Sequence, residues 1–183
     1  NAFGGCSNLT SIEIPYGVTT IGSAAFQNCT GLTSIKLSET VNSISTSAFN
    51  GIHSLAFEVA DNNNTYSTIN GVLFSKDKTT LIRYCLDQTN PNYTIPNTTT
   101  LIGDDAFYGC NKLSSITIPN TVKAIGARAF ESSVFFVHSF NCRDKNLFHT
   151  FFCYFFCIVR VWCYCSHTTC VKTFIIIKCT FMV

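Results

Sequence analysis

The chain has 183 residues, of which 46% are hydrophobic, and a formal net charge of +2. This is long enough for one ordinary domain with a core of its own. Charge is uneven, because residues 1–130 carry 7 Lys and Arg against 8 Asp and Glu, whereas residues 131–183 carry 5 against 2. The near-neutral first part has no basic patch, so we expect no nucleic-acid partner.

The chain begins with an internal repeat. An Ala-Phe pair starts at Ala2, Ala25, Ala48, Ala106 and Ala129, and three of the four gaps are 23 residues. Each copy continues with Leu-x-x-Ile-x-Ile or a close variant, which is typical of leucine-rich repeats. We therefore predict an α/β-type repeat solenoid that is mostly β, with about five short parallel strands. Because Asn1 falls inside a repeat, we interpret the chain as a fragment, and any signal peptide would lie upstream.

The fourth gap is 58 residues long and so holds an insertion of 35 residues, at about 61–92. Residues 69–74 and 79–84 are rich in strand formers, and a polar segment at 76–78 separates them. This pattern predicts a β-hairpin. The repeat resumes at Tyr93 in phase with Ala106. Residues 48–60 and 93–105 are therefore expected to form one coil that the hairpin splits.

Three cysteines, Cys6, Cys29 and Cys110, occupy the same position of their repeats, where the third copy has Ile52. Neighbouring parallel strands lie about 4.8 Å apart, so a disulfide between Cys6 and Cys29 is conceivable. The isoleucine instead favours a buried apolar position, in which free cysteine is common.

The repeat pattern stops at residue 134, so we expect a solenoid over 1–133 and a separate tail over 134–183. The tail has no Gly or Pro and is rich in Phe and Cys. It is open to three interpretations: a membrane anchor, a cysteine-based metal or disulfide module, and a mistranslated segment, which we favour. The anchor would be residues 147–165, near the length that spans a bilayer, although Arg160 lies inside it. This segment is the only candidate for membrane contact.

The repeat reads Ala-Phe-x-x-Cys-x-x-Leu-x-x-Ile-x-Ile-Pro-x-x-Val-x-x-Ile-Gly, and the insertion contains Asn-Gly-Val-Leu-Phe. Over residues 1–133 this combination resembles the BspA-like leucine-rich repeat surface antigens. The resemblance implies a cell-surface or extracellular protein that adheres to host matrix proteins or other cells. It carries no catalytic residues and no agreed binding motif to transfer.

The strand face that points away from the core is the usual ligand surface of a solenoid. Phase in the repeat assigns to it the candidate protein-binding residues Ser11, Glu13, Ser34, Lys36, Glu58, Thr94, Ser115 and Thr117. Among these, Glu13, Lys36 and Glu58 are expected to form a ladder of alternating charge across neighbouring strands. The ladder fits a solvated structural row, which we favour, and also a dedicated contact site.

No common catalytic motif is present, and the only histidine in the repeat region, His53, lacks a plausible catalytic partner. We therefore expect no enzyme and no catalytic, cofactor-binding or metal-ligating residue. The predicted function is a non-enzymatic adhesion scaffold whose ligand is a matrix or cell-surface protein. The alternative is a structural spacer, or the remnant of a broken gene with no independent function.

Overall fold

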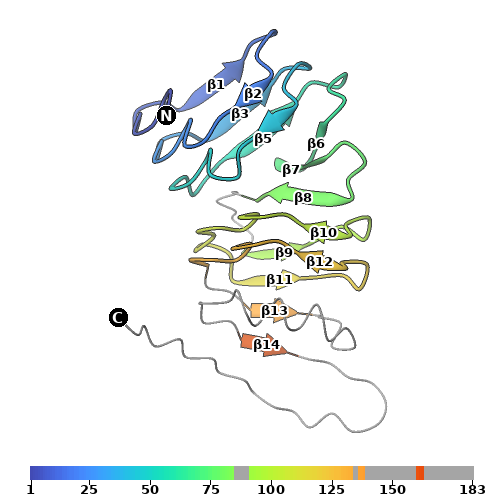
Figure 1. Ribbon diagram of the computed structural model, residues 1–183. Helices are drawn as coiled ribbons and strands as arrows, with labels where there is room; N and C mark the ends of the chain where they lie inside the picture. The colour runs from blue at the N-terminus through green and yellow to red at the C-terminus, as the bar shows by residue number, and fades with distance from the viewer. Residues whose placement is uncertain (85–90, 134–135, 139–159, 163–183) are drawn as a thin grey trace, which may run out of the picture.

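The computed structural model describes residues 1–84, 91–133, 136–138 and 160–162. These residues form fourteen short strands and no helix. Figure 1 shows the strands layered along one long axis, with β1 near one end and β14 near the other. The predicted solenoid of leucine-rich-repeat type, mostly β, is confirmed.

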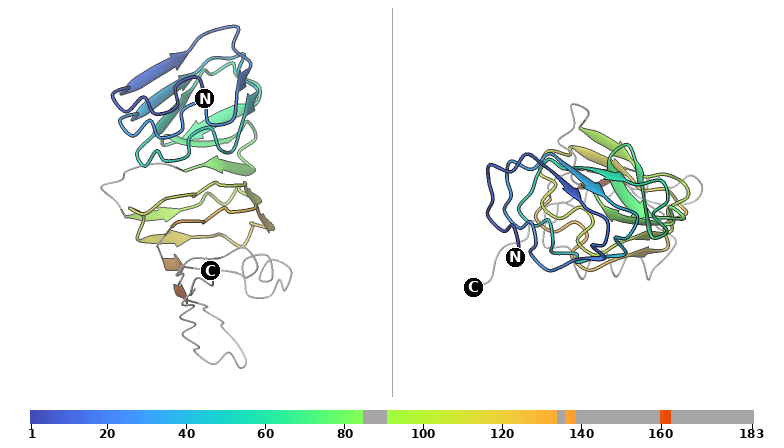
Figure 2. Two further views of the ribbon diagram at one scale, coloured as in Figure 1. Left: turned by 60° about the vertical axis from the view of Figure 1, so that its left-hand side comes forward. Right: turned by 90° about the horizontal axis from the view of Figure 1, so that it is seen from above.

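The strand face is built from two parallel sheets. The first contains β1 (Ser11–Ile14), β3 (Ser34–Leu37) and β5 (Ala56–Val59). The second contains β9 (Asn92–Thr94), β11 (Ser115–Thr117), β13 (Phe136–His138) and β14 (Arg160–Trp162). Ser11 pairs with Ser34, and Asn92 with Ser115, so the 23-residue offset of the sequence is the register of the sheets. Figure 2 shows the two groups of strands one after the other along the axis.

The return side of the coils carries shorter strands: β2 (Thr20–Ile21), β4 (Ser43–Ile44), β10 (Leu101–Ile102) and β12 (Ala124–Ile125). β2 pairs with β4, and β10 pairs with β12. Alternate strand residues point inward, so Ile35 and Leu37 of β3 are fully buried while Lys36 between them is exposed. Apolar residues at the repeat positions thus form the core.

Between the two parallel sheets lies a three-stranded meander of β6 (Tyr66–Ile69), β7 (Val72–Ser75) and β8 (Thr80–Arg83). The predicted hairpin is confirmed as the antiparallel pair of β7 and β8. The expectation of one continuous strand over 69–74 is wrong. Asn70 and Gly71 both have positive φ, 50° and 79°, and form a two-residue turn that folds β6 back onto β7. Asn-Gly is the sequence best suited to such a turn.

The expectation of one coil split by the hairpin is also wrong, because β5 pairs with β3 whereas β9 pairs with β11. β8 pairs in parallel with β10 and so begins a coil of its own. In that coil Tyr84 takes the position of the repeat phenylalanine. Its backbone N–H donates to Ala106 O at 2.7 Å, as that of Phe107 does to Ala129 O. The Ala-Phe pattern does not reveal this coil, because Arg83-Tyr84 occupies the position that Ala-Phe has in the other coils.

Two apolar cores result, and we call the residues around them the first stack (1–60) and the second stack (79–84 and 91–133). Strand β7 contributes to both cores: Leu73 packs in the first, whereas Val72 and Phe74 pack in the second. The buried guanidinium of Arg83 joins the stacks, donating from Nη1 to Asp105 O at 2.6 Å and from Nη2 to Phe49 O at 3.4 Å. Strand β7 and the Arg83 side chain therefore both connect the two stacks.

The cysteine position of the repeat donates a side-chain hydrogen bond in three coils, whereas in a fourth it holds the apolar side chain of Ile52. Cys29 Sγ donates to Phe3 O at 2.9 Å and Cys110 Sγ to Tyr84 O at 3.2 Å, in both cases 26 residues back. Ser133 fills the same position of the next coil, and its hydroxyl donates to Phe107 O. Cys29 is a buried free thiol, as the preferred interpretation required, and the alternative of a Cys6–Cys29 disulfide is wrong. Cys6 is exposed instead of buried, because it lies in the outermost described coil.

The predicted boundary between solenoid and tail falls where few residues are described. β13 pairs in parallel with β11, and β14 with β13, so the column of strands continues beyond residue 133. The proposed cysteine module and most of the proposed anchor at 147–165 lie outside the described residues. Of the anchor only Arg160–Trp162 is described, as strand β14. The division into 1–133 and 134–183 stays a prediction.

Replacing Arg83 by Met should weaken the joint, because the carbonyls of Phe49 and Asp105 would lose buried donors. Hydrogen bonds to a charged group contribute about 1.5–3 kcal/mol each, and the Phe49 bond is long. We expect the free energy of unfolding to fall by about 2–4 kcal/mol in a urea titration. Lys123→Met, on an exposed side chain, is the control. Equal stability of the two variants would contradict the role given to Arg83.

Asn63 anchors the loop after β5. It is completely buried, and its amide nitrogen donates to Ser38 O and Val41 O, each at 2.8 Å. Its side-chain oxygen accepts from the backbone N–H groups of Thr65 and Tyr66, also at 2.8 Å. The side chain is thus fully hydrogen-bonded and ties the start of the meander to the preceding coil.

Replacing Asn63 by Ala should lower the free energy of unfolding by about 2–4 kcal/mol, because four backbone groups lose their partners, two of them in buried hydrogen bonds. The neighbouring Asn62 is exposed and contacts only the Glu39 side chain through its own. Asn62→Ala should therefore change the free energy by about 0.5 kcal/mol or less. Thermal or urea unfolding of the two variants, side by side, measures the difference.

Candidate functional site

The outward side of β1, β3 and β5, which we call the first face, carries a row of charges between small residues. Glu13 pairs in register with Lys36, and Lys36 with Glu58. On one side the neighbouring row is Ser11, Ser34 and Ala56; on the other it is Pro15, Ser38 and Ala60. Small flanking side chains leave the charged groups accessible on the sheet. The predicted ladder of alternating sign is therefore present, with Glu58 in the position assigned to it.

The electrostatics of the row centre on Lys36. Its Nζ lies 2.9 Å from Glu13 Oε1, and the two side chains are 51% and 66% exposed. The pKa of Lys36 is raised above its usual value, mainly by the hydrogen bond to Glu13, then by the charge of that carboxylate, and least by the charge of Glu58. An ion pair this exposed contributes little to stability, because water and salt screen it. The row therefore does little to hold the fold together.

The outward side of β9 and β11, which we call the second face, is uncharged. Thr94 pairs with Thr117, and Asn92 pairs with Ser115, whose hydroxyl contacts the Asn92 side-chain oxygen. Thr94 and Asn92 are exposed, whereas Ser115 and Thr117 are half-buried. Asn92 was absent from the candidate residues, although its 23-residue offset from Ser115 could have identified it.

The candidate residues thus fall on two sheets instead of one continuous surface. Ser11, Glu13, Ser34, Lys36 and Glu58 lie together on the first face. Thr94, Ser115 and Thr117 lie together on the second, beyond the joint. No hydrogen bond joins β5 to β9, because the backbone N–H of Phe57 in β5 donates to Gly71 O of the meander instead. The first face therefore holds all the charged candidates.

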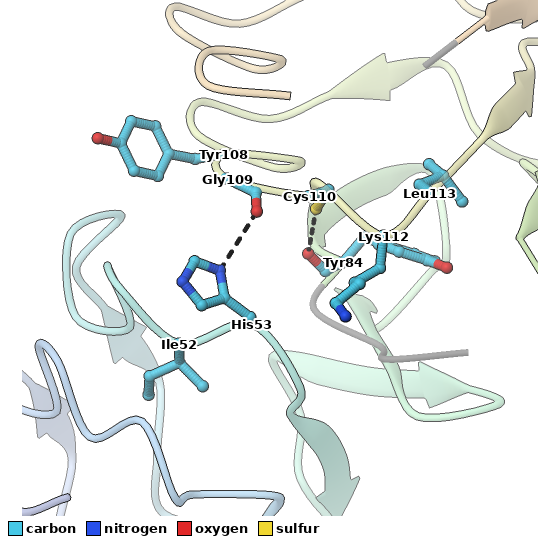
Figure 3. A pocket seen from close by; sticks show the side chains of 8 residues that line it. All are labelled: Ile52, His53, Tyr84, Tyr108, Gly109, Cys110, Lys112 and Leu113. Carbon is cyan, nitrogen blue, oxygen red and sulfur yellow. Dashed lines mark hydrogen bonds between the residues drawn. The ribbon is translucent and has the colours of Figure 1, made fainter. Parts of the chain in front are cut away.

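A small hollow lies at the joint, between the turn at Ile52 and His53 and the turn at 108–113 (Figure 3). Its free space is about the size of one water molecule. His53 Nδ1 lies 3.4 Å from Gly109 O, and the Cys110 thiol donates to Tyr84 O. These polar groups thus contact the protein itself, and the hollow is too small for a substrate.

The described part of the chain contains no cluster of three or more His, Cys, Asp or Glu side chains that could hold a metal ion. His53 contacts a backbone carbonyl and has no carboxylate beside it among the interactions of the described residues. Across the same residues, no helix has the length and apolarity to cross a membrane.

Comparison with known proteins identifies the class of this solenoid. The sequence matches the BspA type leucine-rich repeat region in six copies, over residues 1–90 and 79–160. The chain therefore belongs to the BspA-type leucine-rich repeat family. A comparison with curated protein sequences found no match.

Solved structures similar to the chain are bacterial leucine-rich repeat proteins. One from Eubacterium ventriosum is 27% identical, with a TM-score of 0.56 over 70% of this chain and 42% of that one. The pneumococcal vaccine antigen PcpA is 26% identical, with a TM-score of 0.56 over 68% and 37%. A leucine-rich cell surface protein of Faecalibacterium prausnitzii is 27% identical, with a TM-score of 0.52 over 74% and 44%. The chain thus spans less than half the length of these structures.

The charge row can be tested by titration. Glu13→Gln should lower the pKa of Lys36, because the carboxylate that stabilises its ammonium form is lost. Glu58→Gln should lower it less, since the Glu58 charge is the weakest of the contributions. NMR titration of the lysine side chain in each variant measures both shifts. A larger effect from Glu58 than from Glu13 would contradict the pairing of Lys36 with Glu13.

Proposed function

We propose that the chain is a non-enzymatic scaffold that binds a protein through the first face while displayed at a cell surface. The observation that carries the proposal is the exposed, register-aligned row of Glu13, Lys36 and Glu58 on a parallel sheet. Charged groups that contribute little to folding stability are free to contribute to the specificity and rate of association.

Two further observations support the proposal. Surface proteins occur among the similar structures: one is a leucine-rich cell surface protein and another is a vaccine antigen. The hollow at the joint is about one water molecule in size, so it offers no room for a substrate. A matrix or cell-surface protein is the class of ligand that we infer.

The test is binding of the full chain to a panel of purified extracellular-matrix proteins, measured by surface plasmon resonance. The exchange Lys36→Glu with Glu58→Lys keeps the net charge but reverses part of the row. We expect it to weaken binding to a responding protein about tenfold or more. The exchange Lys123→Glu with Glu131→Lys, on the second stack, is the control and should change little.

Two outcomes would contradict the proposal. Unchanged binding by the Lys36 and Glu58 exchange would remove the first face as the contact surface. A folded chain that binds nothing across the panel would favour the spacer. Circular dichroism of each variant confirms that the solenoid is retained.

A further inference from the structure

The three charged side chains of the first face are unequally paired. Lys36 is bonded to Glu13, and no hydrogen bond or ion pair from any described residue reaches the carboxylate of Glu58. Lys36 lies directly opposite Glu58 in the register, but its ammonium is drawn to the other neighbour. Glu58 is exposed and has only the small residues Ala56 and Ala60 beside it on its own strand. Its carboxylate is therefore the charge of the row that no described side chain pairs with.

The residues around the first face also carry a net negative charge. Lys36 is the only Lys or Arg of the first stack (1–60), which includes three acidic residues: Glu13, Glu39 and Glu58. One positive side chain against three negative ones gives this stack a side-chain charge of −2. Lys76 of the meander lies close to its edge, since its Nζ donates to Asp61 O at 2.9 Å. The first stack still carries net negative charge, whereas the outward residues of β9 and β11 are uncharged.

We propose that the first face selects a partner with a basic segment, one of whose Arg or Lys side chains pairs with Glu58. This inference rests on the proposed function and adds the charge of the ligand to it. Arginine suits the position well, because a planar guanidinium can bind a carboxylate through two parallel hydrogen bonds. The flanking alanines and serines leave room for the guanidinium to approach.

The proposal predicts opposite changes in affinity for two substitutions on neighbouring strands. Glu58→Gln removes the carboxylate that the partner binds, so affinity for a basic segment should fall. Lys36→Gln removes the cation that competes for the same carboxylates and repels the partner, so affinity should rise. An acidic partner would reverse both changes, because it would bind Lys36 and be repelled by Glu58. The pair of variants therefore reports the charge of the ligand.

The experiment uses the full chain labelled with 15N and two nine-residue peptides, one alternating Arg with Ser and one alternating Glu with Ser. We expect the Arg peptide to shift the amide signals of β1, β3 and β5, and the Glu peptide not to. Glu58→Gln should raise the Kd of the Arg peptide about fivefold or more, and Lys36→Gln should lower it about twofold or more. Glu131→Gln, on the second stack, is the matched control and should leave the Kd unchanged. Raising the salt concentration should weaken the interaction of the unmodified chain.

Other results overturn the inference in distinguishable ways. If the Glu peptide binds and both variants change in the opposite direction, the ligand is acidic, and the proposed function stands without the inference. If neither peptide shifts the first face but panel proteins still respond to the Lys36 and Glu58 exchange, the inference alone fails. If those proteins also ignore the exchange, both fail.

Discussion

The structure depends on the inability of a 23-residue coil to bury its own apolar face. Each coil points apolar side chains and one aromatic ring into its interior. These side chains are shielded from water only when a neighbouring coil stacks in the same register. Phe3, Phe26 and Phe49 stack with ring centroids 5.2 and 5.7 Å apart, and Tyr84, Phe107 and Phe130 repeat the arrangement at 5.2 and 5.1 Å. Backbone hydrogen bonds and a thiol or hydroxyl donor fix the same offset. Stability is therefore shared between neighbours, coil by coil.

Among the described residues, the joint is the one place where the repeat rings of successive coils do not stack on each other. The ring of Phe49 packs edge-on against Phe57 of its own stack, at 5.2 Å and 84°, and the buried Arg83 guanidinium takes the carbonyl of Phe49. The meander supplies the missing continuity, since its middle strand faces one core with Leu73 and the other with Val72 and Phe74. The hydrogen bonds of Arg83 and the shared strand β7 thus stand where a stacked ring would otherwise connect the coils. The charged first face and the uncharged second face lie on opposite sides of this joint.

Much of the fold was predictable from sequence because the repeat encodes the register directly. The spacing of the Ala-Phe pairs gave the pairing of Ser11 with Ser34, and alternation along the strands placed Glu13, Lys36 and Glu58 outward. The coil beginning at β8 could not be predicted from the Ala-Phe pattern, because Arg83-Tyr84 stands at the position of that pair. The same Arg83 side chain bonds across the joint. The meander escaped for a local reason: Asn70 and Gly71 interrupt an apolar run that otherwise reads as one strand. Which carboxylate of the row would be unpaired was beyond sequence, since it depends on the side chosen by one flexible lysine.

The Cys position of the coil has a consequence for how such proteins change over generations. Cysteine in two coils and serine in a third each donate to the equivalent carbonyl of the preceding coil, 26 residues back. Any small side chain with a hydrogen to donate can therefore serve, and duplication of a coil needs no compensating change at this contact. The joint is different, since Arg83 fits one pair of carbonyls and cannot be copied with a neighbour. Gain and loss of coils should accordingly lengthen or shorten either stack. The one meander between the stacks should be kept, and with it the spacing of the two faces across the joint.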